Sequence, residues 1–143
     1  MQTDNSFSMI ADIYHSIEKL LIDELHQAGV YDLVPSHGKL LYVLFCHHQL
    51  SMKEIADKIQ KKPQTVTALA KKLEKLGYIQ CRKLIDDRRT TVVTLTEKGW
   101  QLEKVFTDIS AKLIAVQYHN ISKEEKKAFV QTLEKIRHNF SAL

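Results

Sequence analysis

The sequence has few cysteines, glycines and prolines. It contains two cysteines, four glycines and two prolines in 143 residues. Cys46 and Cys81 have no CxxC partner and no metal-ligand spacing, which argues against a disulfide scaffold or a zinc finger and favours free thiols. Because the sequence also has no glycine-rich phosphate loop and no paired nucleophile and base, we expect neither an enzyme nor a bound cofactor.

Long hydrophobic runs are also missing. No segment approaches the roughly 18 consecutive apolar residues that a membrane span needs. Residues 1–10 lack the basic start and apolar run of a secretory signal. Hydrophobic residues make up 44% of the chain, which is ordinary for a globular protein of one domain. We therefore expect a cytoplasmic protein with no membrane partner.

Positive charge is concentrated in the middle of the chain. The net charge is +4 at pH 7. Residues 51–90 hold eleven Lys or Arg against five Asp or Glu, so this segment carries +6 and the remainder carries −2. A protein that faces phosphates with one surface needs such a distribution, although an ordinary solvated face is equally compatible with it.

The first half of the sequence predicts four helices. Apolar residues recur with helical spacing over 9–28, and Pro35 opens a largely apolar segment, predicted to be a buried helix, that runs to Cys46. Ser51 and Glu54 have the spacing of a capping box and predict a short helix from Ser51 to Ile59. Pro63 suits a first helical position, and the helix that it opens runs to Leu76 before Gly77.

After Gly77 the pattern changes to that of strands. Residues 78–83 and 90–95 are rich in β-branched and aromatic side chains, and a charged turn separates them, which predicts a β-hairpin. Thr96 then caps a long amphipathic helix, and Ser122 with Glu125 forms a second capping box for a last helix. The predicted fold is mainly α with a small β-hairpin wing, a winged helix-turn-helix with further helices on its N- and C-terminal sides.

The helix that begins at Pro63 divides into an apolar face and a polar face. The outward set places small polar groups near the N-terminus, where base edges are within reach, and lysines farther along, where phosphates would lie. The alternative is a solvated amphipathic face, which the lysines alone favour. The candidate DNA-binding residues of this region are Lys62, Gln64, Thr65, Thr67, Ala68, Lys71 and Lys72.

The predicted hairpin supplies the remaining candidates for DNA binding, Arg82, Lys83, Arg88 and Arg89. Arginines at a hairpin tip can extend into a narrow minor groove, where the negative potential is strongest. We expect Asp86 and Asp87 to pair with these arginines and hold the guanidinium groups in place. The alternative is a set of exposed surface ion pairs worth less than about 1 kcal/mol.

Three blocks of sequence together resemble the MarR family of bacterial regulators. The first block is Leu50-Ser51-Met52-Lys53-Glu54-Ile55-Ala56, the second combines Thr65-Val66-Thr67 with Leu73-Glu74-Lys75-Leu76-Gly77-Tyr78-Ile79, and the third combines Asp87-Arg88-Arg89 with Val93-Thr94-Leu95-Thr96-Glu97-Lys98-Gly99. The resemblance covers nearly the whole chain, and the block that ends in Leu-Thr-Glu-Lys-Gly is its most specific part.

The resemblance implies a sequence-specific, ligand-responsive repressor that binds a pseudo-palindromic double-stranded operator as a homodimer. It divides the chain, a single domain over 1–143, into a DNA-binding region at 36–95 and dimerisation helices at 1–35 and 96–143. Two positions depart from the family pattern. Lys62 replaces the usual Ser or Thr, and Ala68 replaces a frequent Arg, so we expect a site preference that differs from that of relatives.

The resemblance also implies a small lipophilic or aromatic effector, which His37, Tyr42 and Trp100 could contact in a cleft, although isolated residues of these types are more often core or helix-end side chains. Seven histidines give no metal-ligand spacing, so we expect no metal site. Of the two thiols we expect Cys46 to be buried and Cys81 to be the better candidate for oxidation. An enzyme and a winged module for protein association remain the alternatives, and salt dependence of DNA binding separates them from a regulator.

Overall fold

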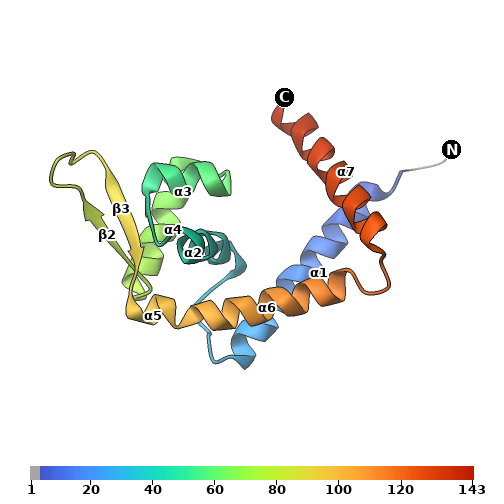
Figure 1. Ribbon diagram of the computed structural model, residues 1–143, viewed down its shortest axis with the longest axis horizontal. Coiled ribbons are helices and arrows are strands. Elements are labelled where there is room, and N and C mark those ends of the chain that lie inside the picture. The colour runs from blue at the N-terminus through green and yellow to red at the C-terminus, as the bar shows by residue number, and fades with distance from the viewer. Residues whose placement is uncertain (1–3) are drawn as a thin grey trace. The chain divides into compact units, whose positions relative to one another are not determined.

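The computed structural model describes residues 4–143, so residues 1–3 of the predicted N-terminal dimerisation segment lie outside the described residues. The chain forms two compact units, Met1–Ile109 and Ser110–Leu143. The first unit holds α1 (Ser6–Gln27), α2 (Pro35–His47), β1 (Gln49–Ser51), α3 (Met52–Ile59), α4 (Pro63–Lys75), β2 (Ile79–Lys83), β3 (Thr91–Leu95), α5 (Glu97–Trp100) and the start of α6 (Leu102–Gln117) (Figure 1). The second holds the rest of α6 and α7 (Lys123–Ser141).

The helix boundaries follow the predicted capping residues closely. The Ser51 hydroxyl accepts the Glu54 backbone N–H at 3.1 Å, and the Glu54 carboxylate accepts the Ser51 backbone N–H at 3.3 Å. Ser122 and Glu125 repeat this reciprocal pairing at the start of α7. Gly77 ends the α4 segment with a φ of +86°, a backbone conformation that side-chain-bearing residues rarely adopt. Both capping boxes and the Gly77 stop are therefore confirmed.

The predicted hairpin belongs to a three-stranded antiparallel sheet in the order β1-β3-β2. β2 pairs with β3 from Ile79 opposite Leu95 to Lys83 opposite Thr91, which confirms the predicted hairpin. The third strand, β1, was missed: Leu50 pairs with Val93. β1 has three residues, and only Leu50 is buried, so it is too short to show the alternation that identifies a strand.

A close backbone approach at Gly99 joins the sheet to the helices that follow it. A Cβ atom at Gly99 would lie 2.1 Å from the Tyr78 carbonyl oxygen, so only glycine fits there. The Thr96 hydroxyl accepts the Gly99 N–H at 3.1 Å, which confirms the predicted cap. The single long helix predicted after Thr96 is instead two helices, α5 and α6, with a break at Gln101. The Gln101 N–H still donates to the Glu97 carbonyl at 3.1 Å, so the helical path is nearly continuous.

The core of the first unit lies between α2, α3, α4 and the sheet. Its largest fully buried side chains are Leu40, Leu41, Leu44, Ile55, Val66, Leu73, Ile79 and Val93. Burying aliphatic side chains of this size contributes about 1.5–3 kcal/mol each to the stability of the fold. This shared core holds α4 and the sheet together. The prediction that α2 is a buried helix is wrong in part, because Tyr42 and Cys46 lie on an exposed face. Among the described residues, no helix is long and apolar enough to cross a membrane.

Candidate nucleic-acid interface

The polar face of α4 is open to solvent. Val66, Ala70 and Leu73 are buried, whereas Gln64, Thr65, Ala68, Lys71 and Lys72 are exposed. Thr67 is half-buried, and its hydroxyl donates to the Pro63 carbonyl at 2.9 Å. The division of α4 into an inward apolar face and an outward polar face therefore agrees with the sequence pattern, and the candidate residues lie on one continuous strip of the helix.

The N-terminus of α4 is the second feature of this surface. Lys62 is the N-cap residue, with an extended backbone at φ −66° and ψ 145°. Within residues 4–143, no side chain caps this helix, since a lysine cannot accept the N–H groups that a Ser or Thr would accept. The first N–H groups of α4 and the Lys62 ammonium are thus both available to an anion.

The β2–β3 hairpin projects from the first unit next to α4 and α3 (Figure 1). Arg82 and Lys83 are exposed on β2, and Arg88 and Arg89 are exposed in the turn that follows. These four side chains carry positive charge without an ion-pair partner among the described residues. The hairpin therefore adds a basic ridge beside the exposed face of α4.

Asp87 supports this turn in a different way from the one predicted. Its carboxylate accepts the Arg89 backbone N–H at 3.0 Å and the Thr90 hydroxyl at 2.9 Å. In the part of the chain that the structure describes, no ion pair joins Asp86 or Asp87 to the Arg88 or Arg89 guanidinium. The predicted bracing of the guanidinium groups is wrong: Asp87 orders the backbone of the turn, because a short carboxylate reaches the N–H group two residues later.

A polar network at Tyr78 ties the end of α4 to the base of the hairpin. The Tyr78 hydroxyl donates to Asp32 Oδ1 at 2.8 Å, and Lys98 Nζ lies 4.4 Å from the Tyr78 ring centroid. Lys98 Nζ also donates to the Leu76 carbonyl at 2.7 Å, and the Thr96 hydroxyl donates to the Gly77 carbonyl at 2.6 Å. Sequence reasoning missed this network, which fixes the position of the hairpin relative to α4.

We expect Tyr78→Phe to lower the free energy of unfolding by about 1 kcal/mol at pH 7, because it removes one hydrogen bond. Burial, followed by the hydrogen bond to Asp32, raises the pKa of Tyr78 from 10.0 to about 12. Below pH 10 the Tyr78 hydroxyl is protonated in both the folded and the unfolded chain, so its contribution to stability is fully present. This contribution is lost as pH rises from 10 to 12, because the hydroxyl ionises in the unfolded chain before it ionises in the folded protein. The advantage of the wild type over Tyr78→Phe in urea unfolding should therefore shrink over this interval.

The control for this measurement is Tyr31→Phe, since Tyr31 is 73% exposed and close in sequence to Asp32. It should leave the free energy of unfolding within about 0.5 kcal/mol of the wild type at neutral pH. An equal loss in Tyr31→Phe and Tyr78→Phe would contradict the role given to the Tyr78 hydroxyl.

The two cysteines occupy environments opposite to those expected. Cys46 is exposed on α2 and not buried. Cys81 is half-buried, its backbone N–H donates to Glu74 Oε2 at 2.7 Å, and burial followed by the charge of Glu74 raises the pKa of its thiol to about 11. A thiol with a raised pKa remains protonated at neutral pH and reacts slowly with oxidants. The preference for Cys81 over Cys46 as an oxidation site is therefore reversed.

The three residues predicted to contact an effector occupy different environments. His37 is 2% exposed, and its Nδ1 accepts the Val34 backbone N–H at 3.1 Å at the start of α2. Burial, followed by the charge of Lys72, lowers the pKa of His37, which keeps the ring neutral so that it can accept this bond. Tyr42 is 58% exposed. Trp100 packs against Phe45 and His48, with ring centroids 6.0 Å and 5.1 Å apart.

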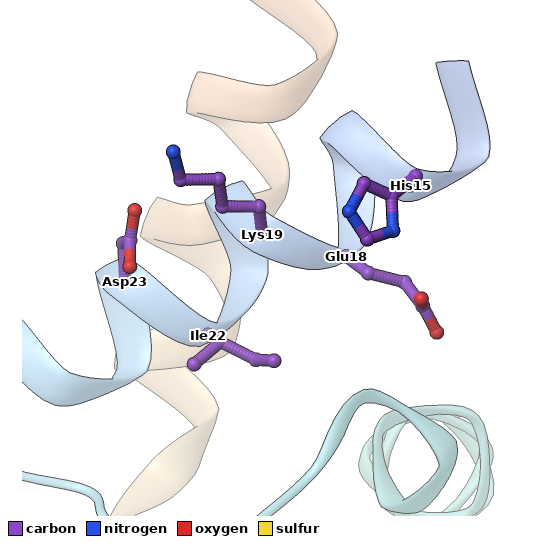
Figure 2. A pocket seen from close by; sticks show the side chains of 5 residues that line it. All are labelled: His15, Glu18, Lys19, Ile22 and Asp23. Carbon is purple, nitrogen blue, oxygen red and sulfur yellow. The ribbon is translucent and has the colours of Figure 1, made fainter. Parts of the chain in front are cut away.

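A shallow pocket of about 260 Å³ lies on α1 and is lined by His15, Glu18, Lys19, Ile22 and Asp23. Figure 2 shows that the five side chains come from this one helix and point in different directions. None of the residues predicted to contact an effector lines it. Within the described range 4–143, no group of three or more His, Cys, Asp or Glu side chains is arranged to hold a metal ion.

Comparisons with known proteins agree with this geometry. Residues 33–91 match the model of the MarR family. The HTH-type transcriptional regulator YwhA of Bacillus subtilis is 28% identical over 108 residues, which are 72% of this chain and 78% of YwhA. The crystal structure of the S. aureus MepR–DNA complex is similar with a TM-score of 0.85 and 26% identity, covering 99% of this chain and 100% of MepR. The organohalide-sensing regulator RdhR-CbdbA1625, solved with 2,4-dichlorophenol bound, has a TM-score of 0.82 and 26% identity, covering 93% of this chain and 78% of its own.

Proposed function

Since the chain belongs to the MarR family of winged helix-turn-helix transcriptional regulators, we propose that it is a sequence-specific repressor that binds double-stranded DNA as a homodimer. The observation that carries this proposal is the exposed polar strip of α4 beside an arginine-bearing hairpin on the same compact unit. The likeness to MepR, which was solved in complex with DNA, supports it.

In this proposal α4 enters the major groove and the hairpin reaches the adjacent minor groove. Gln64 and Thr65 lie in the first turn of α4 and face base edges, while Lys71 and Lys72 lie two turns later and contact phosphates. The open N-terminus of α4 and Lys62 hold a further phosphate. The Ala68 side chain has no hydrogen-bonding group. Discrimination between bases therefore depends on the residues around Ala68 and on the shape of the minor groove.

Homodimer formation is supported by apolar side chains that each unit leaves in solvent. On α1 the exposed set is Phe7, Met9, Ile10, Ile13 and Tyr14. On α7 the exposed set is Phe129, Val130, Leu133, Ile136 and Phe140. Contiguous apolar surface on amphipathic helices is costly to leave in water, and a second copy of the same chain covers it symmetrically. In this proposal residues 36–95 form the DNA-binding region and the flanking helices, at 1–35 and 96–143, form the dimer.

A small aromatic effector is the second part of the proposal. Its support is the likeness to RdhR-CbdbA1625, which was solved with 2,4-dichlorophenol bound. His37, Tyr42 and Trp100 remain the candidate contacts, and a ligand that favours one spacing of the two α4 helices would change DNA affinity. The cytoplasmic location expected from the sequence also stays a prediction.

Selection of bound sequences from a random duplex pool tests DNA binding, and salt titration on the selected duplex tests the contacts. We expect an inverted repeat and an affinity that falls steeply with salt, because bound cations on DNA are released. Lys71→Ala and Arg89→Ala should each flatten the logarithmic salt slope by about two units, because the proposed homodimer loses one phosphate contact in each subunit. Lys135→Ala, on the polar face of α7, removes the same charge and should leave the slope unchanged.

The outcome of this titration separates regulation from the main alternative. A winged module for protein association needs neither the basic strip of α4 nor the exposed arginines of the hairpin. If no duplex is enriched, or if binding is insensitive to salt in the wild type, the DNA-binding proposal is overturned and protein association takes its place.

A further inference from the structure

The turn between β2 and β3 carries two exposed apolar side chains, Leu84 at its base and Ile85 beyond it. Leu84 is 41% exposed and Ile85 is 90% exposed. Resting on the DNA-binding function proposed above, we propose that Ile85 contacts the minor groove of the operator and selects for flexible base steps beneath the tip. Ile85 is thereby a specificity-determining residue that acts through apolar contact, in addition to the arginines.

The backbone around Ile85 is held by hydrogen bonds on both sides of the turn. The Leu84 N–H donates to the Thr90 carbonyl at 3.1 Å, and the Thr90 N–H donates to the Asp87 carbonyl at 3.1 Å. The Asp87 carboxylate fixes Arg89 and Thr90 from the same side. Ile85 thus lies in a turn whose base is closed by hydrogen bonds, which reduces the backbone freedom that the turn has to lose on binding.

The charge around Ile85 argues for DNA as the occupant. A single exposed isoleucine is common on protein surfaces, but its neighbours in the turn and on the adjoining strand are the exposed cations Lys83, Arg88 and Arg89. Asp86 and Asp87 offset part of this charge, although the Asp87 carboxylate is already hydrogen-bonded within the turn, so the surroundings of Ile85 remain net positive. These cations disfavour an apolar or basic protein partner and favour a polyanion. The minor groove offers phosphates on its rims and apolar deoxyribose faces on its walls, so it accommodates both the cations and the isoleucine.

Apolar contact in the minor groove has a recognisable effect on sequence preference. Aliphatic side chains that enter between base steps partly unstack them and kink the duplex. Unstacking costs least at pyrimidine–purine steps such as TA and CA. The operator is therefore expected to carry such a step at the position that lies beneath the tip, even though Ile85 makes no hydrogen bond there.

The experiment compares Ile85→Ala and Ile85→Leu with the wild type on the selected duplex. We expect Ile85→Ala to lower affinity about tenfold and to leave the salt slope unchanged, because an apolar contact releases no counterions. Ile85→Leu keeps the apolar volume and should bind within about twofold of the wild type. Because Ile85 is exposed, neither change should alter thermal unfolding.

A fluorescent base analogue reports the unstacking directly. With 2-aminopurine placed at the pyrimidine–purine step beneath the tip, we expect wild-type protein and Ile85→Leu to raise its fluorescence and Ile85→Ala not to raise it. If the wild type binds the duplex and Ile85→Ala binds equally well, the inference about Ile85 is overturned while the DNA-binding function stands. If the wild type binds no duplex, the proposed function itself fails.

Discussion

Ala68→Glu is expected to reduce affinity for the selected operator by at least about 100-fold, equivalent to about 3 kcal/mol. Ala68 is exposed at the centre of the polar strip of α4, between the residues proposed to face bases and the lysines proposed to face phosphates. A carboxylate there meets the phosphates and base acceptors of DNA with like charge. It also lies four residues before Lys72, where it can form a helical ion pair that holds this lysine away from DNA. Fluorescence anisotropy with labelled duplex measures the loss.

The matched control for Ala68→Glu is Gln131→Glu, which adds the same charge on the exposed polar side of α7. The control changes the net charge equally, so it should lower affinity less than about threefold. Circular dichroism should show the same helix content in both variants, because Glu is a good helix former and both positions are exposed. Equal losses in the two variants, or full binding by Ala68→Glu, would mean that α4 does not face DNA.

The helices of this chain were predictable because their ends are encoded locally. Ser51 with Glu54, and Ser122 with Glu125, pair within one turn of helix, so no distant residue is needed to identify them. The opposite holds for β1. Leu50 is a strand residue only because it pairs with Val93, which is distant in sequence. The sequence of Gln49–Ser51 alone does not identify that partner.

The candidate interface was predictable to a similar extent and for a similar reason. The polar face of α4 follows from the helical period, whereas the roles of individual side chains depend on tertiary contacts. The contact between Tyr78 and Asp32 joins residues 46 positions apart, and periodicity contains no sign of it. The buried His37 was likewise unexpected as an acceptor for the Val34 N–H, since Ser, Thr, Asp and Asn usually occupy the ends of helices in this role.

Two errors could have been avoided with the local rules already in use. Tyr42 and Cys46 are four residues apart on α2 and lie on the exposed face, opposite the Leu40 and Leu44 side chains that fill the core. Because α2 was interpreted as apolar on most sides, its exposed face was not predicted. Asp87 precedes Arg89 by two residues, the spacing at which an aspartate accepts a backbone N–H, so its structural role was available from the sequence.

The second large effect is expected from Leu133→Arg, which should convert the protein to a monomer. Leu133 lies in the middle of an apolar stripe on α7 that also contains Phe129, Ile136 and Phe140, and none of the described α7 residues is buried. If a second copy covers this stripe, a guanidinium at its centre is buried without a partner, which costs several kcal/mol. Sedimentation equilibrium measures the change, and Gln131→Arg, on the polar side of α7, is the control that should remain dimeric.

Loss of the dimer should lower DNA affinity by about 100-fold or more. A monomer contacts one half-site, whereas in a dimer the second subunit is held close to the second half-site and binds it at little further cost in translational entropy. The chain's single tryptophan, Trp100, provides the folding check, since it packs against Phe45 and His48 in the first unit. Unchanged Trp100 emission together with a monomeric mass attributes the loss to assembly and not to unfolding of the DNA-binding unit. A Leu133→Arg protein that remains a dimer with wild-type affinity would remove the α7 stripe from the interface, and the inverted repeat expected in the operator would need another source of symmetry.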